Sequence, residues 1–264
     1  MRSEAALPAS GLSLDRPAWP PAAEVTWNGW LALAIYLFSI LGSVLLGVGA
    51  IAAVLVYDSV VGSPARALQH FVELGENGAF VIALSAPAPL IALVLAYLTV
   101  RAGARRRVGF LQAMRALPPY RWHHVVLVVI GAFVLAFALD LVAAALQRPA
   151  VPEVLRELTD TRPEWTVFTL WAGVGAALEE ILYRGFLLPP AQRRFGAGGG
   201  ILAVSLAFGL PHVLTYGLDV VLVGIASVMG LYLTLARHLT GSTVPGIAAH
   251  MLINLFAASQ LYPA

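Results

Sequence analysis

The chain contains no cysteine, which excludes disulfide bonds, thiol chemistry and cysteine-ligated metal. All 16 of its basic residues are arginine, a bias that genome composition is enough to explain and that predicts no mechanism. Charged residues are also scarce, at 11% of 264 residues, whereas soluble domains usually carry about 25%. A soluble core of this size cannot hide a 59% hydrophobic composition with a mean hydropathy of +0.83. These absences predict a polytopic membrane protein.

Long apolar runs separate the few charged residues, and most are near the roughly 20 residues that a spanning helix needs. They cover about residues 30–57, 80–100, 124–146, 165–188, 201–216, 218–236 and 244–261. A glycine-rich break at 196–200 separates the fourth run from the fifth. We therefore predict an all-α fold, a polytopic transmembrane helical bundle of about seven spans, with six to eight compatible with the pattern.

The chain divides into a short tail and one domain. Residues 1–26 are rich in alanine and proline and lack the compact apolar stretch and cleavage pattern of a signal peptide. We expect them to form a disordered cytoplasmic tail. Residues 27–264 are expected to form a single transmembrane domain, without a separate soluble domain or an inverted repeat.

Arginines are unevenly distributed between the loops, and this predicts the orientation. The loop after the second run carries six arginines and no acidic residue: Arg101, Arg105, Arg106, Arg107, Arg115 and Arg121. A cytoplasmic position for this loop places the N-terminus in the cytoplasm and, with seven spans, the C-terminus outside. The same arginines could bind anionic lipid, although a role in topology is enough to explain them. Arginines clustered in such loops do not indicate a nucleic-acid partner.

Three clusters of polar and ionisable residues interrupt the C-terminal runs. They are Glu-Glu-Ile-Leu-Tyr-Arg at 179–184, Phe-Gly-Leu-Pro-His at 208–212 and His-Met-Leu-Ile-Asn at 250–254. Hydrocarbon penalises a charged residue by at least ~2.5–3.5 kcal/mol. A lone histidine or a lone ion pair could be structural, but three clusters within the last four runs indicate a polar reaction centre.

Spacing assigns different roles to the two adjacent glutamates. Glu180 and Arg184 are four residues apart with the acid first, so on a helix they should pair. A buried arginine needs such a partner. Glu179 is turned by about 100° from Glu180 and has no obligatory cation. We therefore expect Glu179 to act as a general base and Glu180 to support the site.

The histidines and the asparagine allow two kinds of chemistry. His250 and Asn254, four residues apart, could both donate hydrogen bonds to a developing oxyanion. His212 and His250 with a carboxylate could instead hold a zinc ion with an open position. Asp140, near the end of the third run, is expected to be a boundary residue or a partner for an interior polar group.

The ordered motifs Glu-Glu-x-x-x-Arg, Phe-x-x-x-His and His-x-x-x-Asn resemble those of the CPBP family of intramembrane proteases. This family includes the eukaryotic type II CAAX prenyl proteases and bacterial relatives described as bacteriocin-processing, Abi-like or immunity proteins. The matching region covers about residues 165–262, and each motif is short, but the ordered trio is specific.

The resemblance implies an intramembrane CAAX-type endopeptidase that hydrolyses a peptide bond. Glu179 with His212 would activate a water, and His250 with Asn254 would stabilise the oxyanion. Glu180 with Arg184 would support the site. Family members carry metalloprotease labels, so the site is expected either to need no cofactor or to bind a divalent metal such as zinc through His212 and His250.

Other intramembrane protease classes do not fit the sequence. It contains no His-Glu-x-x-His, no Gly-x-Gly-Asp and no Gly-x-Ser-Gly motif. Without these motifs, the zinc site-two, aspartyl and rhomboid types fit the chain poorly.

Two other functions remain compatible with these residues: a non-catalytic membrane scaffold or immunity protein, and, less well supported, a proton-coupled transporter. The expected partners are membrane lipid and a peptide or protein substrate, which could be prenylated. The expected location is the bacterial inner (plasma) membrane.

Overall fold

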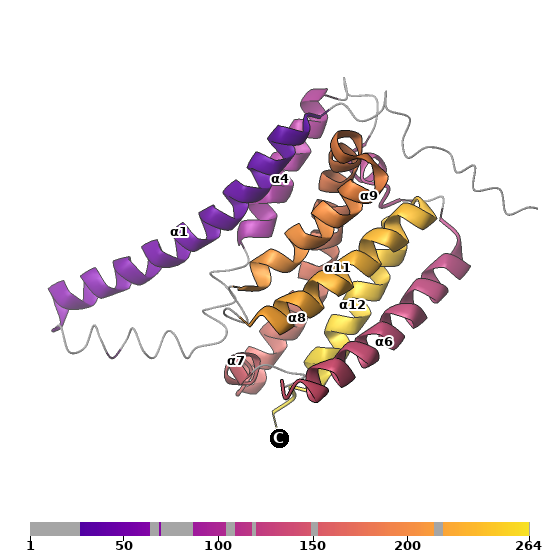
Figure 1. Ribbon diagram of the computed structural model, residues 1–264. Coiled ribbons are helices and arrows are strands. Elements are labelled where there is room, and N and C mark those ends of the chain that lie inside the picture. Colours follow the sequence, from indigo (N-terminus) through magenta and orange to yellow (C-terminus); the bar gives the residue numbers. More distant parts are fainter. Residues whose placement is uncertain are drawn as a thin grey trace, which may run out of the picture.

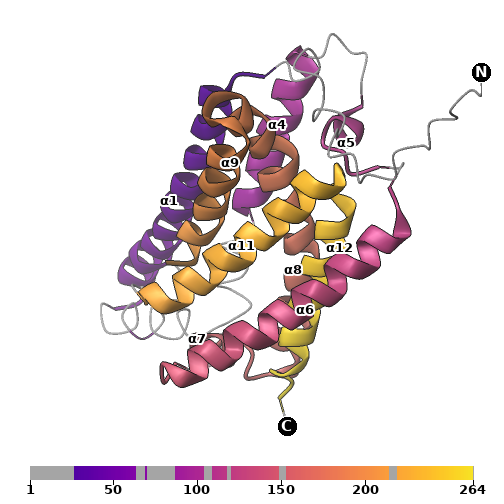
Figure 2. The ribbon, with the colours of Figure 1, turned by 45° about the vertical axis from the view of Figure 1, so that its right-hand side comes forward.

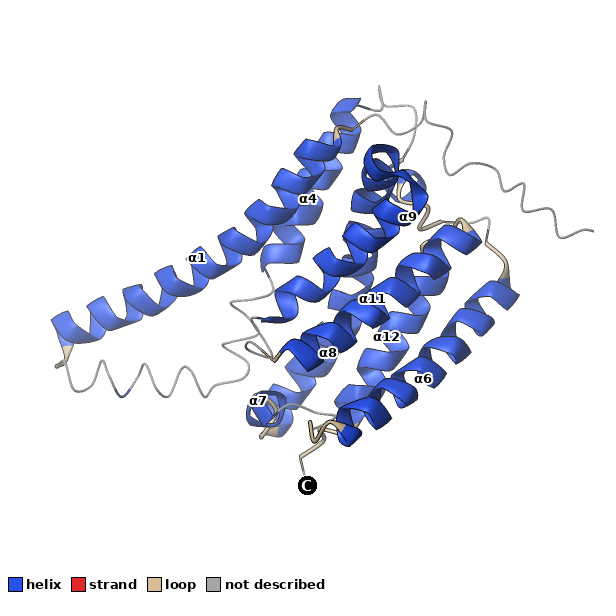
Figure 3. Cartoon of the chain, viewed as in Figure 1, coloured by secondary structure: helices blue, strands red, loops and turns tan. Residues whose placement is uncertain are grey.

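Helices make up the fold in the computed structural model, which describes residues 27–63, 69, 87–103, 109–117, 120–148, 153–213 and 219–263. No strand occurs among these residues (Figure 3), so the predicted all-α class is confirmed. The tail predicted at 1–26 lies outside the described residues.

The helical elements follow the apolar runs of the sequence (Figure 1). They are α1 (Gly29–Val61), α4 (Pro87–Gly103), α5 (Phe110–Ala113), α6 (Trp122–Ala145), α7 (Glu153–Glu157), α8 (Arg162–Glu180), the π-helix η1 (Ile181–Leu187), α9 (Leu188–Gly209), the 3₁₀ turn η2 (Leu210–His212), α11 (Val220–Thr240) and α12 (Val244–Ser259). Residues 80–86 of the second predicted run and 214–216 of the fifth lie outside the described part.

Four of the described helical segments are long and apolar enough to cross a membrane. They are α1, α6, α11 and the continuous run Arg162–His212; Pro89–Ala102 and Val244–Ser259 are shorter apolar helices. The run Arg162–His212 has 51 residues and is interrupted at Gly196, so it accounts for two of the predicted runs. The total of about seven spans stays a prediction.

Local sequence explains where several of these helices begin and end. Thr161 and Glu164 form a capping box at the start of α8, where the threonine hydroxyl accepts from the Glu164 N–H. The Asp219 carboxylate accepts the N–H groups of Val221 and Leu222 at the start of α11. Gly241 ends α11 in the left-handed conformation, with φ of 70°.

The break expected at 196–200 is confined to one residue. Gly196 has φ of 73° and ψ of 173°, whereas residues 197–200 are already helical. Side chains other than hydrogen do not tolerate this backbone conformation, so glycine is required at the turn. The turn brings the second half of α9 back beside the segment that precedes it.

We expect Gly196→Ala to destabilise the protein by about 1–3 kcal/mol, because alanine strains the backbone at this φ and ψ. Gly198→Ala is the matched control: this glycine has no positive φ, and no atom of the described residues lies within 4 Å of the position that a Cβ would occupy. Thermal unfolding in detergent compares the two variants. Equal melting temperatures would contradict the strain argument.

The C-terminal helices form the centre of the bundle (Figure 2). α12 packs against α8 and α6, while α11 packs against α9 and α6. These contacts bring the ends of the three sequence motifs towards the interior of the bundle.

α1 lies on the side of the bundle away from α6, where it packs against α4, α9 and η1 (Figure 1). The Trp27 indole stacks on Phe186 at 5.6 Å and donates to the Phe186 carbonyl at 3.0 Å. Further along, the Tyr36 hydroxyl donates to the carbonyl of Ala207. Two aromatic residues near the start of α1 thus attach it to η1 and α9.

Candidate active site

The three sequence motifs meet where α8, η1, η2 and α12 approach one another. Glu179 and Glu180 are the last residues of α8, and Arg184 lies in η1. His212 ends η2, whereas His250 and Asn254 are on α12. Contacts between α8 and α12, about 70 residues apart in sequence, therefore assemble the candidate site.

Glu180 and Arg184 form the predicted ion pair, and both side chains are fully buried. Arg184 Nη1 donates to Glu180 Oε1 at 2.7 Å. Its Nη2 donates to the Gly230 carbonyl at 2.9 Å and its Nε to Thr234 Oγ1 at 3.3 Å, both on α11. Hydrogen bonds of this kind are what allow a buried charge pair to persist.

The π-helix η1 begins directly after the two glutamates. Its hydrogen bonds run from i to i+5, and such segments occur frequently at functional sites. Sequence spacing assumed ordinary α-helical geometry here and gave no sign of the wider turn. The pair between Glu180 and Arg184 nevertheless forms across it.

His250 lies between the two glutamates. Its Nδ1 is 3.1 Å from Glu180 Oε1, and its Nε2 is 3.9 Å from Glu179 Oε2. Because a carboxylate oxygen only accepts, Nδ1 carries a proton and donates a hydrogen bond to Glu180. The second nitrogen therefore faces Glu179. The sequence did not predict this contact of His250 with both glutamates.

Glu179 differs from Glu180 in exposure, since 37% of its side chain is accessible whereas Glu180 has none. Its carboxylate is close enough to interact electrostatically with Tyr36, Tyr183 and His212. The structure thus gives the two adjacent acids different surroundings: one is fixed by Arg184 and the other is accessible.

Phe208 is the aromatic centre of the site. Its ring contacts those of Tyr183, His212 and His250, with centroid distances of 5.2, 5.3 and 5.5 Å. The Arg184 guanidinium lies 4.4 Å from the ring centroid, within the range of a cation–π interaction. Phe208 therefore packs against the imidazole of His212, which lies four residues further along the chain.

His212 lies in the 3₁₀ turn that follows Gly209 and includes Pro211. Its Nδ1 donates to the Phe208 carbonyl at 3.1 Å, which fixes the ring and leaves Nε2 as an acceptor. Asn254 Nδ2 donates to the Ala172 carbonyl of α8 at 3.3 Å. The donors of His250 and Asn254 thus have separate partners within the protein, so their joint action on an oxyanion stays a prediction.

A cavity of about 210 Å³ joins the second and third motifs. His212, His250 and Asn254 line it, together with apolar side chains of α6, α11 and α12. Asp140 lines it as well, from α6, so this residue has a place beside the candidate site that sequence position did not reveal. Glu179 does not line this cavity and approaches it through His250.

Three residues without a sequence signal complete the site: Gly230 and Thr234, which bind Arg184, and Gly246. Glu180 Oε2 makes no hydrogen bond within the described part of the chain. A Cβ on Gly246 would come within 2.7 Å of this oxygen, closer than real contacts allow. Only glycine at 246 lets α12 approach the buried carboxylate.

We expect Gly246→Ala to reduce stability by about 1–3 kcal/mol, because Arg184 holds the carboxylate that would have to move. Gly224→Ala, on α11, is the control, since a Cβ there would have no atom of the described chain within 4 Å. Both changes raise helix propensity equally, so the difference between them isolates the steric effect. A comparison of melting temperatures in detergent tests it, and a Gly246 variant as stable as the control would contradict the close approach.

The donor set does not support the metal hypothesis. Among the described residues, no group of three or more His, Asp or Glu side chains is placed to hold a metal ion. A catalytic zinc ion takes three protein ligands, and within the described part of the chain the site does not bring three such side chains together. The residues as arranged therefore do not complete a zinc centre.

The part of the chain that carries this site matches a known protein family. The family model described as type II CAAX prenyl endopeptidase Rce1-like matches residues 161–256. Residues 161–256 form an Rce1-like domain. The match confirms the resemblance to the CPBP proteases and contains all six predicted site residues: Glu179, Glu180, Arg184, His212, His250 and Asn254.

The Rce1-like domain implies a peptidase that acts on a peptide or protein substrate in a lipid environment. Together with the apolar helices, it identifies the chain as an integral membrane protein. No curated protein and no solved structure matched the chain.

Proposed function

We propose that the protein is an intramembrane endopeptidase in which Glu179 activates the attacking water. The observation that carries the proposal is the position of His250 between an accessible glutamate and a buried one. An accessible carboxylate at the edge of a poorly solvated site is suited to accept a proton. The fully buried Glu180 is committed to Arg184 and His250 instead.

In the proposed reaction, the water oxygen bonds to the carbonyl carbon of the scissile peptide while its proton passes to Glu179. His212 Nε2 orients the water. The resulting oxyanion accepts hydrogen bonds from His250 Nε2–H and the second amide hydrogen of Asn254. The C–N bond then breaks as Glu179 returns the proton to the leaving nitrogen, which gives a carboxylic acid and an amine; the acid then loses its proton to water.

In this role His250 donates through both ring nitrogens, from Nδ1 to Glu180 and from Nε2 to the oxyanion. Glu180 would then orient His250, and Arg184 would fix Glu180.

The arginines and the cavity lie at different ends of the bundle. Arg121 precedes α6 and Arg193 precedes the Gly196 turn, whereas the cavity is lined by Ala143 and Ala257 near the opposite ends of α6 and α12. If the arginine-rich end is cytoplasmic, the cavity opens towards the extracytoplasmic half of the inner membrane. We propose that the substrate segment enters there. Prenylation of the substrate is not required by this geometry.

The test is cleavage of a panel of fluorogenic peptides, prenylated and unprenylated, by the purified protein in liposomes with and without chelator. Cleavage that is lost in His212→Ala and His250→Ala but resists chelator would support a glutamate-activated water. Loss with chelator and recovery with zinc would overturn the metal-free mechanism.

The alternative functions give different outcomes. A scaffold or immunity protein would cleave no peptide and would keep its biological activity in a Glu179→Gln variant. A proton-coupled transporter would show proton-dependent uptake into the same liposomes.

A further inference from the structure

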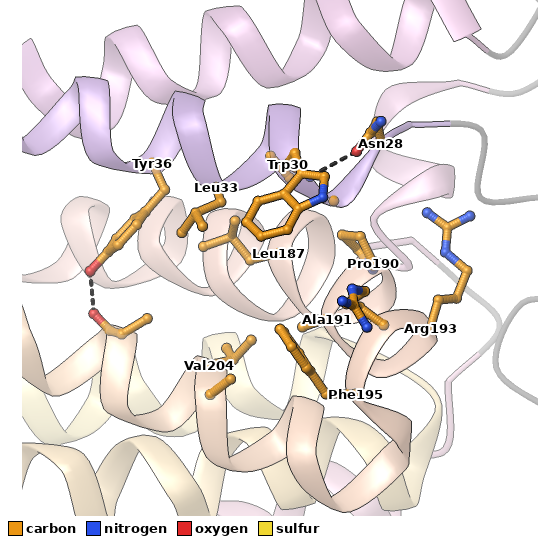
Figure 4. A pocket seen from close by; sticks show the side chains of 15 residues that line it. Asn28, Trp30, Leu33, Tyr36, Leu187, Pro190, Ala191, Arg193, Phe195 and Val204 are labelled. Carbon is orange, nitrogen blue, oxygen red and sulfur yellow. Dashed lines mark hydrogen bonds between the residues drawn. The ribbon is translucent and has the colours of Figure 1, made fainter.

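A second cavity, of about 340 Å³, lies between α1 and α9 (Figure 4). Trp30 and Leu33 of α1 form one wall, while Leu187 and Val204 lie opposite. This groove is independent of the proposed endopeptidase site and contains none of the six motif residues.

The groove combines an apolar wall with a basic end. Arg193 and Arg194 line it where α9 approaches the Gly196 turn, and none of the described residues that line it is acidic. Arg193 donates to the Trp27 carbonyl at 2.6 Å, which holds its guanidinium at this end, and Arg194 lies over the Phe195 ring. The lining thus has a long apolar section and two positive charges at one end.

The two arginines lie at the level where lipid headgroups of the cytoplasmic leaflet are expected. Arg193 and Arg194 lie at the same end of the bundle as Arg121, the end that the arginine distribution places in the cytoplasm. Basic pockets between transmembrane helices on this side bind anionic lipid headgroups. The apolar section runs from there towards the middle of α1, where hydrocarbon lies.

The second half of α9 separates the groove from the candidate active site. Val204 and Ala207 line the groove, whereas Phe208 and His212 line the catalytic cavity. A substrate peptide in the catalytic cavity therefore does not fill the groove. A molecule that matches the lining of the groove is amphipathic and negatively charged at one end, and the bilayer supplies such molecules.

We propose that this groove binds an anionic phospholipid, with its phosphate at Arg193 and Arg194 and an acyl chain along Leu33, Leu187 and Val204. The two arginines provide the positive charge that complements the phosphate. The bound lipid connects α1 to α9 beside the Tyr36 contact.

The test uses full-length protein in detergent with added phosphatidylglycerol or phosphatidylcholine, read by native mass spectrometry and by melting temperature. We expect phosphatidylglycerol alone to be retained and to raise the melting temperature. Arg193→Gln/Arg194→Gln should bind it roughly 30-fold more weakly, because each arginine contributes about a fivefold factor. Glycerol phosphate, which lacks acyl chains, should not stabilise the protein.

The controls separate recognition from general charge and from folding. Arg156→Gln/Arg162→Gln removes the same charge outside the groove lining and should bind like wild type. Arg193→Lys/Arg194→Lys should keep most of the binding. Ala203→Phe fills the groove and should lose it, whereas Leu202→Phe, an exposed neighbour outside the lining, should not.

Equal retention of the two lipids would overturn the proposal. So would equal losses in the two Arg→Gln double variants, or unchanged binding in Ala203→Phe. Each comparison is made on variants whose melting temperature without added lipid matches wild type, so that a folding defect is not counted as lost binding.

Discussion

Replacing Arg184 by methionine is expected to lower the free energy of unfolding by about 3–5 kcal/mol. The change leaves the Glu180 carboxylate fully buried without its cation, and it also removes the hydrogen bonds to Gly230 and Thr234. Steric loss is small because methionine fills much of the same space. Denaturation in mixed micelles, followed by tryptophan fluorescence, gives the difference.

A second substitution identifies the cause of this loss. Glu180→Gln in the Arg184→Met background removes the uncompensated charge and should recover a large part of the stability. Arg101→Met, at the exposed end of α4, is the control and should change stability by less than about 1 kcal/mol. If the double variant were as unstable as Arg184→Met alone, charge pairing would not be the reason.

Glu179→Gln is expected to reduce peptide cleavage by about 10²–10⁴-fold while the protein stays folded. Glutamine keeps the size and hydrogen-bonding capacity of the side chain but cannot accept the water proton. Because Glu179 is accessible and lies 3.9 Å from His250, its removal should cost little stability. The measurement is the single-turnover rate with the best peptide of the panel, beside the melting temperature.

Glu157→Gln is the matched control, because Glu157 is an exposed acid on α7 away from the motifs. It should cleave at the wild-type rate. Glu180→Gln should lose both rate and stability, since Arg184 and His250 would lose their shared partner. Turnover retained by Glu179→Gln would refute the assignment of the base.

The spacing of residues close in the chain was sufficient to predict part of this site. Glu180 and Arg184 pair as the four-residue separation predicts, and Phe208 packs on His212 one helical turn away. The Gly196 turn was also predictable, because the sequence Gly-Ala-Gly-Gly-Gly at 196–200 separates two apolar runs. These features depend on residues that are close in the chain.

Long-range contacts were not predictable in the same way. The hydrogen bond from His250 to Glu180 joins residues 70 positions apart, and its formation depends on how α12 packs against α8. Gly246 matters only because that packing brings it to Glu180 Oε2. Asp140 was expected to be a boundary residue or a partner for an interior polar group, and its place at the cavity follows from the packing of α6 beside α12.

Trp27 and Tyr36 attach α1 to the segment that the family model matches. The family match begins at 161, yet Trp27 covers Phe186, and Tyr36 bonds to Ala207, on the back of that segment. α6 supplies a wall of the catalytic cavity from outside the match as well. An isolated 161–256 segment would therefore expose Phe186 and leave the cavity without its α6 wall.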